Sequence, residues 1–307
     1  VDASSLMGNL LLEDPAVKAA LDQSGAADMA LRPSALVIGA KDGGFQFEVA
    51  SVGEAGQVSP MLTPRTSRFA ALVPADAAVF VSTTGIAQTW ESMVGDARGE
   101  IDDALREYSD YSSLDDMLRD AGEEIGLDSI EDLVKLLEGE TALAVWFPRG
   151  SIDDPEVVVL AETDENTARP IIERIVREGA AGSPERRTVG GVEMTIAVDP
   201  NGEPLAYAFK DGYLAIGTPE AVETVLAMGA GDANLAGLRR YQETVAQMSS
   251  ALGTYAFFNI AALLRLDEMP GMPRQLDEAE RALGGIILNW VEERGVVRVS
   301  GVVTIEE

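Results

Sequence analysis

The side chains of this chain that could carry acid–base chemistry are carboxylates in adjacent pairs. These pairs are Asp102-Asp103, Asp115-Asp116, Glu123-Glu124 and Asp153-Asp154. Hydrolysis by two carboxylates needs an acid and a base that face one cleft and have separated pKa values. Three of the pairs lie in expected helices, opposite the apolar stripe, and this position favours a solvated helix face. We therefore name no catalytic residue and expect a protein that is not an enzyme.

Metal binding would have to rely on oxygen ligands, because the chain contains neither cysteine nor histidine. The same absence excludes cysteine nucleophiles, Ser–His–Asp triads and Cys/His zinc sites. Calcium or magnesium could use the acidic loops Ser151-Ile-Asp-Asp154 and Asp199-Pro-Asn-Gly-Glu203. Neither loop has the spacing of the twelve-residue calcium loop, and Asp-Pro-Asn-Gly is typical of a turn. The sequence does not determine whether a metal binds.

The glycines of Gly229-Ala-Gly231 are the nearest approach to a phosphate-binding loop. A dinucleotide loop follows a strand and needs a further glycine, whereas this segment follows an expected helix. We expect an ordinary loop here and no cofactor.

A group of aromatic side chains could line an apolar ligand cavity. The group consists of Trp90, Trp146, Trp290, Phe147, Phe257 and Phe258. Trp90 and Trp146 lie on faces that the pattern already predicts to be buried, and this favours core packing. Helices laid across an apolar sheet could still enclose a lipid tail, so a hydrophobic ligand remains an alternative.

Composition restricts the partners of this chain of 307 residues. It has 23 Lys and Arg against 52 Asp and Glu, a formal charge of -29, and 46% hydrophobic residues. The acidic surface excludes a nucleic-acid partner and disfavours direct binding to anionic membranes. The apolar fraction is sufficient for a substantial core, in one large domain or two ordinary ones.

Apolar periodicity predicts an α+β fold with a mostly antiparallel sheet of hairpins and meanders, and amphipathic helices on one face. Helices are expected at 5–24, 86–94, 113–126, 129–139, 168–179, 218–226 and 238–248, and around Pro270 and Pro273. Strands are expected at 35–38, 45–49, 78–82, 141–147, 156–161, 192–198, 205–209, 213–216, 252–259 and in a hairpin over 284–304. Pro170 suits only a first turn, so Asn166 or Thr167 is the expected cap of the helix at 168–179. The strand–helix–strand succession over residues 156–198 permits one parallel strand pair.

Two hairpins resemble each other in order. Ala35–Val49 and the segment from Gly285 to Ser300 each run as an apolar strand, a charged turn with glycine and a second strand. This predicts a repeat-derived chain. We expect residues 1–60 to be a helix plus hairpin, the tail of an upstream repeat that docks on the main domain. Residues 61–68 are the expected linker, and 69–307 the full α+β repeat domain.

Three segments and the closing hairpin resemble the DUF3352 family, a bacterial family of unknown function. The segments are Leu72-Val-Pro-Ala-Asp-Ala-Ala-Val-Phe80, Val157–Val176 and Gly212-Tyr-Leu-Ala-Ile-Gly-Thr-Pro-Glu-Ala-Val222. Members often carry an amino-terminal membrane anchor and tandem copies of the unit. The resemblance therefore implies an extracytoplasmic position (periplasmic, cell-surface or secreted), with any membrane anchor upstream of this chain. It brings no catalytic or binding residues.

The leading hypothesis is a non-catalytic extracytoplasmic protein that acts through protein–protein contacts, as an accessory or scaffold subunit. The alternative is a carrier or sensor of a hydrophobic ligand such as a lipid. A third class, a hydrolase that uses only carboxylates, requires two buried acids that face one cleft.

Overall fold

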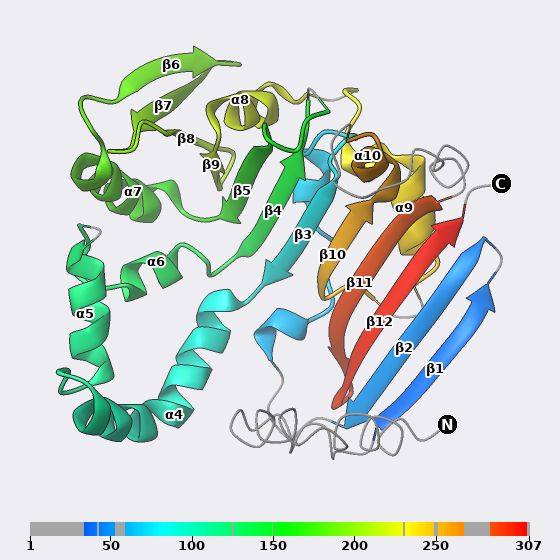
Figure 1. The fold of residues 1–307 in the computed structure, drawn as a ribbon, viewed down its shortest axis with the longest axis horizontal. Coiled ribbons are helices and arrows are strands. Elements are labelled where there is room, and N and C mark those ends of the chain that lie inside the picture. Colours follow the sequence, from blue (N-terminus) through cyan, green and yellow to red (C-terminus); the bar gives the residue numbers. More distant parts are fainter. Residues whose placement is uncertain are drawn as a thin grey trace.

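One antiparallel sheet organises the protein in the computed structural model, which describes residues 34–305 apart from 42, 53–58, 125, 149, 230, 249–250 and 267–282. Its twelve strands lie in the order β1-β2-β12-β11-β10-β3-β4-β5-β9-β8-β7-β6 (Figure 1). The strands are β1 Ser34–Lys41, β2 Gly44–Val52, β3 Val79–Thr84, β4 Glu140–Trp146, β5 Glu156–Glu162, β6 Glu185–Val189, β7 Val192–Val198, β8 Pro204–Lys210, β9 Tyr213–Gly217, β10 Thr254–Asn259, β11 Leu283–Glu293 and β12 Val296–Ile305.

The expected α+β class and its antiparallel hairpins are confirmed. The parallel strand pair that the strand–helix–strand succession over residues 156–198 permitted does not form among the described strands. From β5 the chain crosses to β6 at the far edge and returns through β7 and β8 to β9. Because β5 lies between β4 and β9, both of which run opposite to it, no parallel neighbour is left for it.

Seven helices belong to the described part of the chain. They are α4 Ile86–Tyr108, α5 Leu114–Glu124, α6 Glu131–Lys135, α7 Glu165–Gly179, α8 Pro219–Ala227, α9 Arg239–Ala246 and α10 Ile260–Leu264, with short 3-10 turns η1 Pro60–Leu62, η2 Phe69–Ala71 and η3 Leu235–Gly237. The helix expected at 5–24 and the stretch around Pro270 and Pro273 lie outside the described residues. No described helix is long and apolar enough to cross a bilayer.

The expected cap of α7 was wrong. Asp164 is the N-cap, and its carboxylate accepts a hydrogen bond from the Thr167 backbone N–H at 3.1 Å. The helix therefore begins early enough to place Pro170 inside it, where proline removes one backbone hydrogen bond. The side-chain cap and the packing of Ala168 and Ile172 against the sheet offset that loss.

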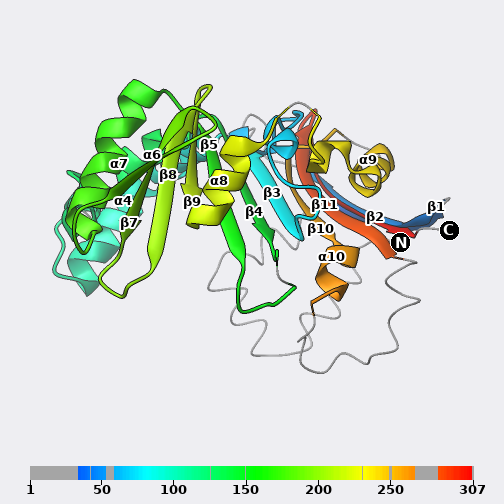
Figure 2. The ribbon, with the colours of Figure 1, turned by 90° about the horizontal axis from the view of Figure 1, so that it is seen from above.

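Helices cover both faces of the sheet, not one as expected. Ala206 and Ala208 of β8 join the main core under α8, whereas Tyr207 and Phe209, which alternate with them, pack in a second cluster with α7. Both faces of this strand are apolar, so both need cover. Figure 2 shows α9 and α10 likewise on opposite sides of the sheet.

The main core lies on the face that carries Phe80, Ala144, Val158, Phe257 and Ile287, which we call the core face. These side chains are almost completely buried. α9 covers part of this face, and Tyr241 of that helix packs edge-on against Phe257 with ring centroids 5.2 Å apart. The alternate residues of the same strands, on the opposite face, are mostly half-buried.

Two hairpins, β1–β2 and β11–β12, meet edge to edge. β2 and β12 pair antiparallel through nine residue pairs, from Val296 opposite Val52 to Thr304 opposite Gly44. Each hairpin turns at a glycine with positive φ, 78° at Gly43 and 76° at Gly295, a conformation that glycine adopts without strain. The amino-terminal hairpin therefore extends the main sheet. The division of the chain into domains and its origin from a repeat remain predictions.

Candidate functional site

The paired carboxylates do not converge on one cleft in the described structure. Those on α4 and α5 engage close neighbours: Asp102 accepts from the Leu114 N–H, Asp103 binds Arg106, Asp115 binds Arg98, and both Asp116 and Glu123 bind Arg119. The hydrogen bond from the Ser112 hydroxyl, together with Arg119, lowers the pKa of Asp116. Asp153 lies in an exposed loop, and the Glu124 side chain is outside the described part. The arrangement is that of a solvated helix surface.

In the acidic loop at Asp199, the Asp199 carboxylate accepts hydrogen bonds from backbone groups of the same turn. Asp199 Oδ1 accepts from the backbone N–H groups of Asn201 and Glu203, each at 2.8 Å. These bonds, the Glu203 N–H foremost, lower the pKa of Asp199. In the second loop, Ser151 Oγ accepts from the Asp153 N–H. No group of three acidic side chains suited to a metal ion occurs among the residues that the structure describes.

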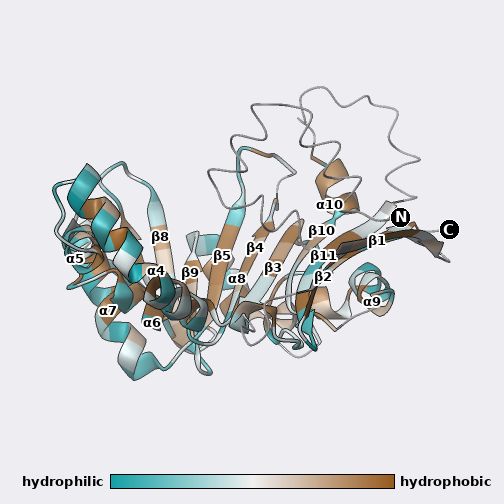
Figure 3. Cartoon of the chain, turned by 90° about the horizontal axis from the view of Figure 1, so that it is seen from below, coloured by the Kyte–Doolittle hydropathy of each residue, from teal (hydrophilic) through white to brown (hydrophobic). Residues whose placement is uncertain are grey.

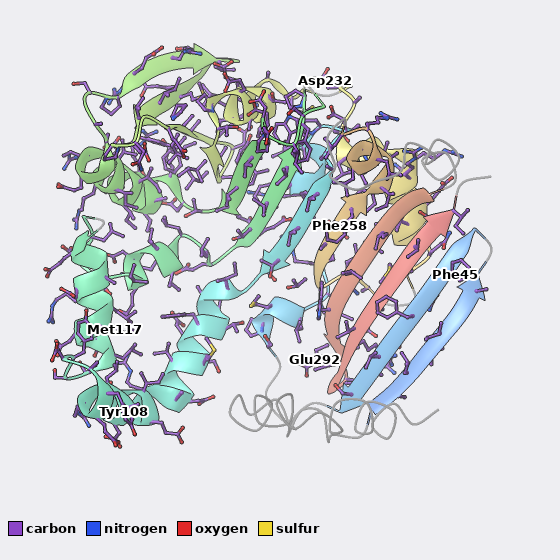
Figure 4. All side chains as sticks on the ribbon, in the orientation of Figure 1. Phe45, Tyr108, Met117, Asp232, Phe258 and Glu292 are labelled. Atoms are coloured by element: carbon purple, nitrogen blue, oxygen red, sulfur yellow. The ribbon has the colours of Figure 1, made fainter. Side chains whose placement is uncertain are left out.

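The loop with Gly229 and Gly231 binds a carboxylate of its own chain. Asp232, labelled in Figure 4, accepts from the Gly229 N–H through Oδ2 at 2.8 Å. This contact places a negative group where a phosphate would have to bind, and it agrees with the expectation of an ordinary loop.

The aromatic residues divide among separate parts of the molecule. Trp146 and Phe257 belong to the main core, whereas Trp90 packs with the small cluster of α4 and α5. Trp290 and Phe258 are half-buried on the opposite face of the sheet. The set therefore does not line a common cavity, and its core members follow the packing interpretation.

A buried carboxylate that sequence reasoning missed lies at one end of β4. Glu140 is 1% exposed, and its Oε2 lies 2.5 Å from Arg65 Nη2 and accepts from the Arg68 backbone N–H at 3.2 Å. Its Oε1 accepts from the hydroxyls of Ser82, at 3.0 Å, and Ser67. A buried charge needs such compensation, because removal from water costs several kcal/mol.

This network fastens residues 59–68, which we call the strap, to the end of the sheet. Besides the Glu140 contacts, the Arg65 N–H donates to the Leu252 carbonyl at 2.6 Å and the Thr254 hydroxyl donates to the Met61 carbonyl at 2.6 Å. A hollow of about 530 Å³ lies beside the strap. All four donors around Glu140 belong to the protein, so we interpret the network as a structural clamp. The sequence did carry a signal for this position. In β4 alternate residues face the core, and continuing that alternation one residue before the expected strand start at 141 places Glu140 on the core face.

Three buried tyrosines lie near members of the clamp. Tyr241 and Tyr255 share a hydrogen bond between their hydroxyls at 2.7 Å, and burial raises the pKa of both. Burial also raises the pKa of Tyr213 to about 12. Tyr213 is 4% exposed, and its hydroxyl has no hydrogen-bond partner among the described residues. All three phenols are therefore neutral at neutral pH.

The largest feature outside these clusters is an apolar surface, which we call the open face. It is the side of strands β5 to β1 opposite the core face, and two rows of cross-strand partners cross it. One row is Val157, Val145, Val79, Phe258, Ile286, Val303, Phe45 and Ala40; the next is Val159, Leu143, Val81, Ala256, Leu288, Gly301, Phe47 and Ile38. A third row begins at β11 with Trp290, Val299, Val49 and Leu36. Figure 4 labels Phe258 and Phe45 of the first row.

The open face is wide and incompletely covered by the described chain. Eight strands at a spacing of about 4.8 Å span roughly 34 Å. From β5 to β11 the alternate residues on the core face are mostly buried, whereas most of those on the open face are half-buried. On the open face Ile38 and Phe45 are 73% and 56% exposed. α10 packs against β10 and β11, but no described helix is drawn over β12, β2 and β1 in Figure 1. Figure 3 shows the hydrophobic strands beside the hydrophilic surfaces of α4 and α5.

Comparison with known proteins gives a family and one solved structure. Residues 5–284 match the family described as "Protein of unknown function (DUF3352)". No curated protein matches the chain. The solved structure titled "Structure of crystal form I of TP0453" is similar with a TM-score of 0.35 and 12% identity, over 77% of this chain and 78% of that one.

Proposed function

We propose that this chain, which belongs to the DUF3352 family, is a non-catalytic protein that acts through protein–protein contacts, as an accessory or scaffold subunit. The open face carries the proposal. Soluble monomers rarely expose a contiguous apolar surface of more than a few hundred Å², and larger ones mark interaction sites. Three adjacent rows of apolar side chains lie on this face, and the exposure of Ile38 and Phe45 among them supports an interaction site here.

The contacts of the acidic side chains support the proposal that the protein is not catalytic. Glu140 is the most deeply buried carboxylate among the described residues, and four protein donors compensate its charge. Asp102, Asp115 and Asp116 make hydrogen bonds or ion pairs on the outer helices. A pair of acids with separated pKa values in one cleft would be needed for hydrolysis.

The partner that we propose is another protein, not a nucleic acid or an anionic membrane. The formal charge of -29 supports this choice, because phosphate groups need a cationic surface. We further propose an extracytoplasmic position, which rests on the resemblance to the DUF3352 family. Protease accessibility of the protein on intact source cells tests that position, and complete protection that persists after the outer layers are permeabilised contradicts it.

Native mass spectrometry of the chain purified gently from its source tests the function. We expect a second polypeptide bound in a fixed ratio. Phe45→Asp, at an exposed position of the open face, should abolish that complex. Val198→Asp is the matched control, because Val198 is 40% exposed on β7, outside the open face.

Other outcomes overturn the proposal. A discrete bound mass in the lipid range, lost with Phe45→Asp, indicates a carrier of a hydrophobic ligand. A turnover activity abolished by one carboxylate substitution indicates an enzyme. A complex that survives Phe45→Asp, or no complex in source material, removes the open face as the interaction site.

A further inference from the structure

The outer edge of β1 is one end of the sheet and one border of the open face. β1 pairs with β2 along its whole length, from Ser34 opposite Ser51 to Lys41 opposite Gly44, and is the last strand in the order. Its other edge has no partner strand in the described structure. Unpaired N–H and C=O groups along an edge are a template for another strand.

Proteins usually protect such edges with charge, proline or a bulge. β1 has no proline or bulge, and its only charged residue is Lys41 at its last position. Residues 35–40 read Ala-Leu-Val-Ile-Gly-Ala, and the register with β2 is continuous. The opposite edge strand, β6, carries more charge than β1, at its first three positions. Glu185, Arg186 and Arg187 are exposed there, and all three make ion pairs.

Exposure on β1 occurs on both faces of the sheet. Ile38 is 73% exposed on the open face, and Val37, which points to the other face, is 59% exposed. An apolar side chain left in water lacks the stabilisation that burial would give it. A strand added at this edge would cover both side chains, whereas a partner on the open face alone would cover only Ile38.

The chain already contains this type of pairing. Hairpins β1–β2 and β11–β12 resemble each other in sequence order and turn conformation, and they join edge to edge through β2 and β12. Because β2 and β12 run antiparallel, the outer edge of β1 corresponds to the outer edge of β11. That edge of β11 carries an antiparallel strand, β10. By this correspondence, the outer edge of β1 is suited to accept an antiparallel strand.

We propose that β1 pairs antiparallel with β1 of a second copy of this chain, so that the two sheets become continuous. A two-fold axis at Ile38 places Leu36 opposite Ala40 and Val37 opposite Gly39. This register keeps the open-face residues of both copies on one side, because antiparallel partners share a face. The inference rests on the proposed function, since it names a second copy as a protein partner.

Charge predicts how the pairing depends on salt. Each chain carries a formal charge of -29, so two copies repel each other at low ionic strength. No acidic side chain lies in β1, and on β2 Glu48 forms an ion pair with Arg298. Added salt screens the long-range repulsion and leaves the apolar contacts intact. Dimerisation should therefore strengthen as sodium chloride is raised.

Sedimentation velocity of the full chain across a concentration series tests the proposal. We expect a monomer–dimer equilibrium with a dissociation constant on the order of micromolar, typical of a small interface. Val37→Lys and Ile38→Lys should each weaken it about tenfold or more, because lysine on an edge strand opposes pairing. Met93→Lys, at a position on α4 that is 58% exposed, is the matched control and should dimerise like the wild type.

Hydrogen exchange of the wild type at two concentrations does not depend on any variant. The β1 amides should be more protected at the concentration where the dimer forms. A chain that stays monomeric at about 100 µM in high salt overturns the pairing, and so does a dimer that neither lysine variant weakens. A dimer weakened by Ile38→Lys but not by Val37→Lys indicates contact through the open face and also overturns it. A monomeric chain that binds a different polypeptide in source material refutes this inference and leaves the proposed function standing.

Discussion

The ion pair between Arg65 and Glu140 predicts both the sign and the size of the stability changes in variants at these two positions. Arg65→Met removes the positive partner and keeps an apolar side chain of similar length. The carboxylate of Glu140, 1% exposed, then retains three neutral donors, the hydroxyls of Ser67 and Ser82 and the Arg68 N–H. It loses its only charged partner in the described structure, at 2.5 Å. Arg65→Met therefore leaves a buried charge uncompensated.

Removal of one member of a buried ion pair typically costs about 3–5 kcal/mol. The three remaining donors place Arg65→Met near the lower limit, at about 3 kcal/mol. Glu140→Gln should cost less, about 1 kcal/mol. The glutamine oxygen can face Arg65 and Arg68 while its amide donates to the two serine hydroxyls, and Arg65 is 25% exposed to water.

The effect of Glu140→Gln on the free energy of unfolding should change sign between the wild type and the Arg65→Met background. In the Arg65→Met background, Glu140→Gln removes the unpaired charge and should restore about 1 kcal/mol, although the same substitution destabilises the wild type. The assay is urea unfolding followed by tryptophan fluorescence. Hydrogen exchange across the strap should rise most in Arg65→Met. Arg106→Met is the control, since its ion pair with Asp103 is exposed and worth about 0.5 kcal/mol or less.

Two results would refute this reasoning. One is a loss of about 1 kcal/mol or less for Arg65→Met, which would mean that the neutral donors suffice. The other is a double variant less stable than Arg65→Met, which would mean that the carboxylate stabilises the fold without its partner.

Three further predictions concern single positions. Gly301→Ala should lower the free energy of unfolding by about 1–3 kcal/mol, because a Cβ there meets the Phe47 ring on the neighbouring strand; in a Phe47→Ala background the loss should largely disappear in the same urea assay. Asp164→Ala should cost about 1 kcal/mol and raise exchange in the first turn of α7, whereas Asp164→Ser should retain most of the cap. The raised pKa of Tyr213 means that its stabilising contribution is complete below pH 10 and lost as the pH rises to about 12. Tyr213→Phe should leave stability at pH 7 unchanged or higher, since its hydroxyl has no partner among the described residues, and should flatten the alkaline decline.

Each of these three has a contradicting result. Equal losses for Gly301→Ala with and without Phe47 would show that the ring does not set the cost. An Asp164→Ser variant as unstable as Asp164→Ala would remove the cap as the cause. An unchanged alkaline decline in Tyr213→Phe would mean that other groups titrate there.

The amino-acid sequence determined the features that depend on neighbours along the chain. Alternation in Phe45, Phe47 and Val49 identified a hairpin strand, because side chains alternate between the two faces of a strand. Ser113 and the Thr218-Pro219 pair predicted helix starts, and α5 and α8 begin immediately after Ser113 and Thr218. The resemblance of three segments and the closing hairpin to the DUF3352 family is confirmed by the family match over residues 5–284.

Tertiary structure decided which faces are covered and which distant residues meet. The pattern of β8 showed two apolar sets, but only the path of the chain from β5 to β6 placed α7 over one and α8 over the other. Arg65 meets Glu140 because the strap crosses the sheet end, a contact that no local period encodes. The open face and the β1 edge likewise arise from strand order. Periodicity states which residues share a face, and only the assembled sheet determines what that face meets.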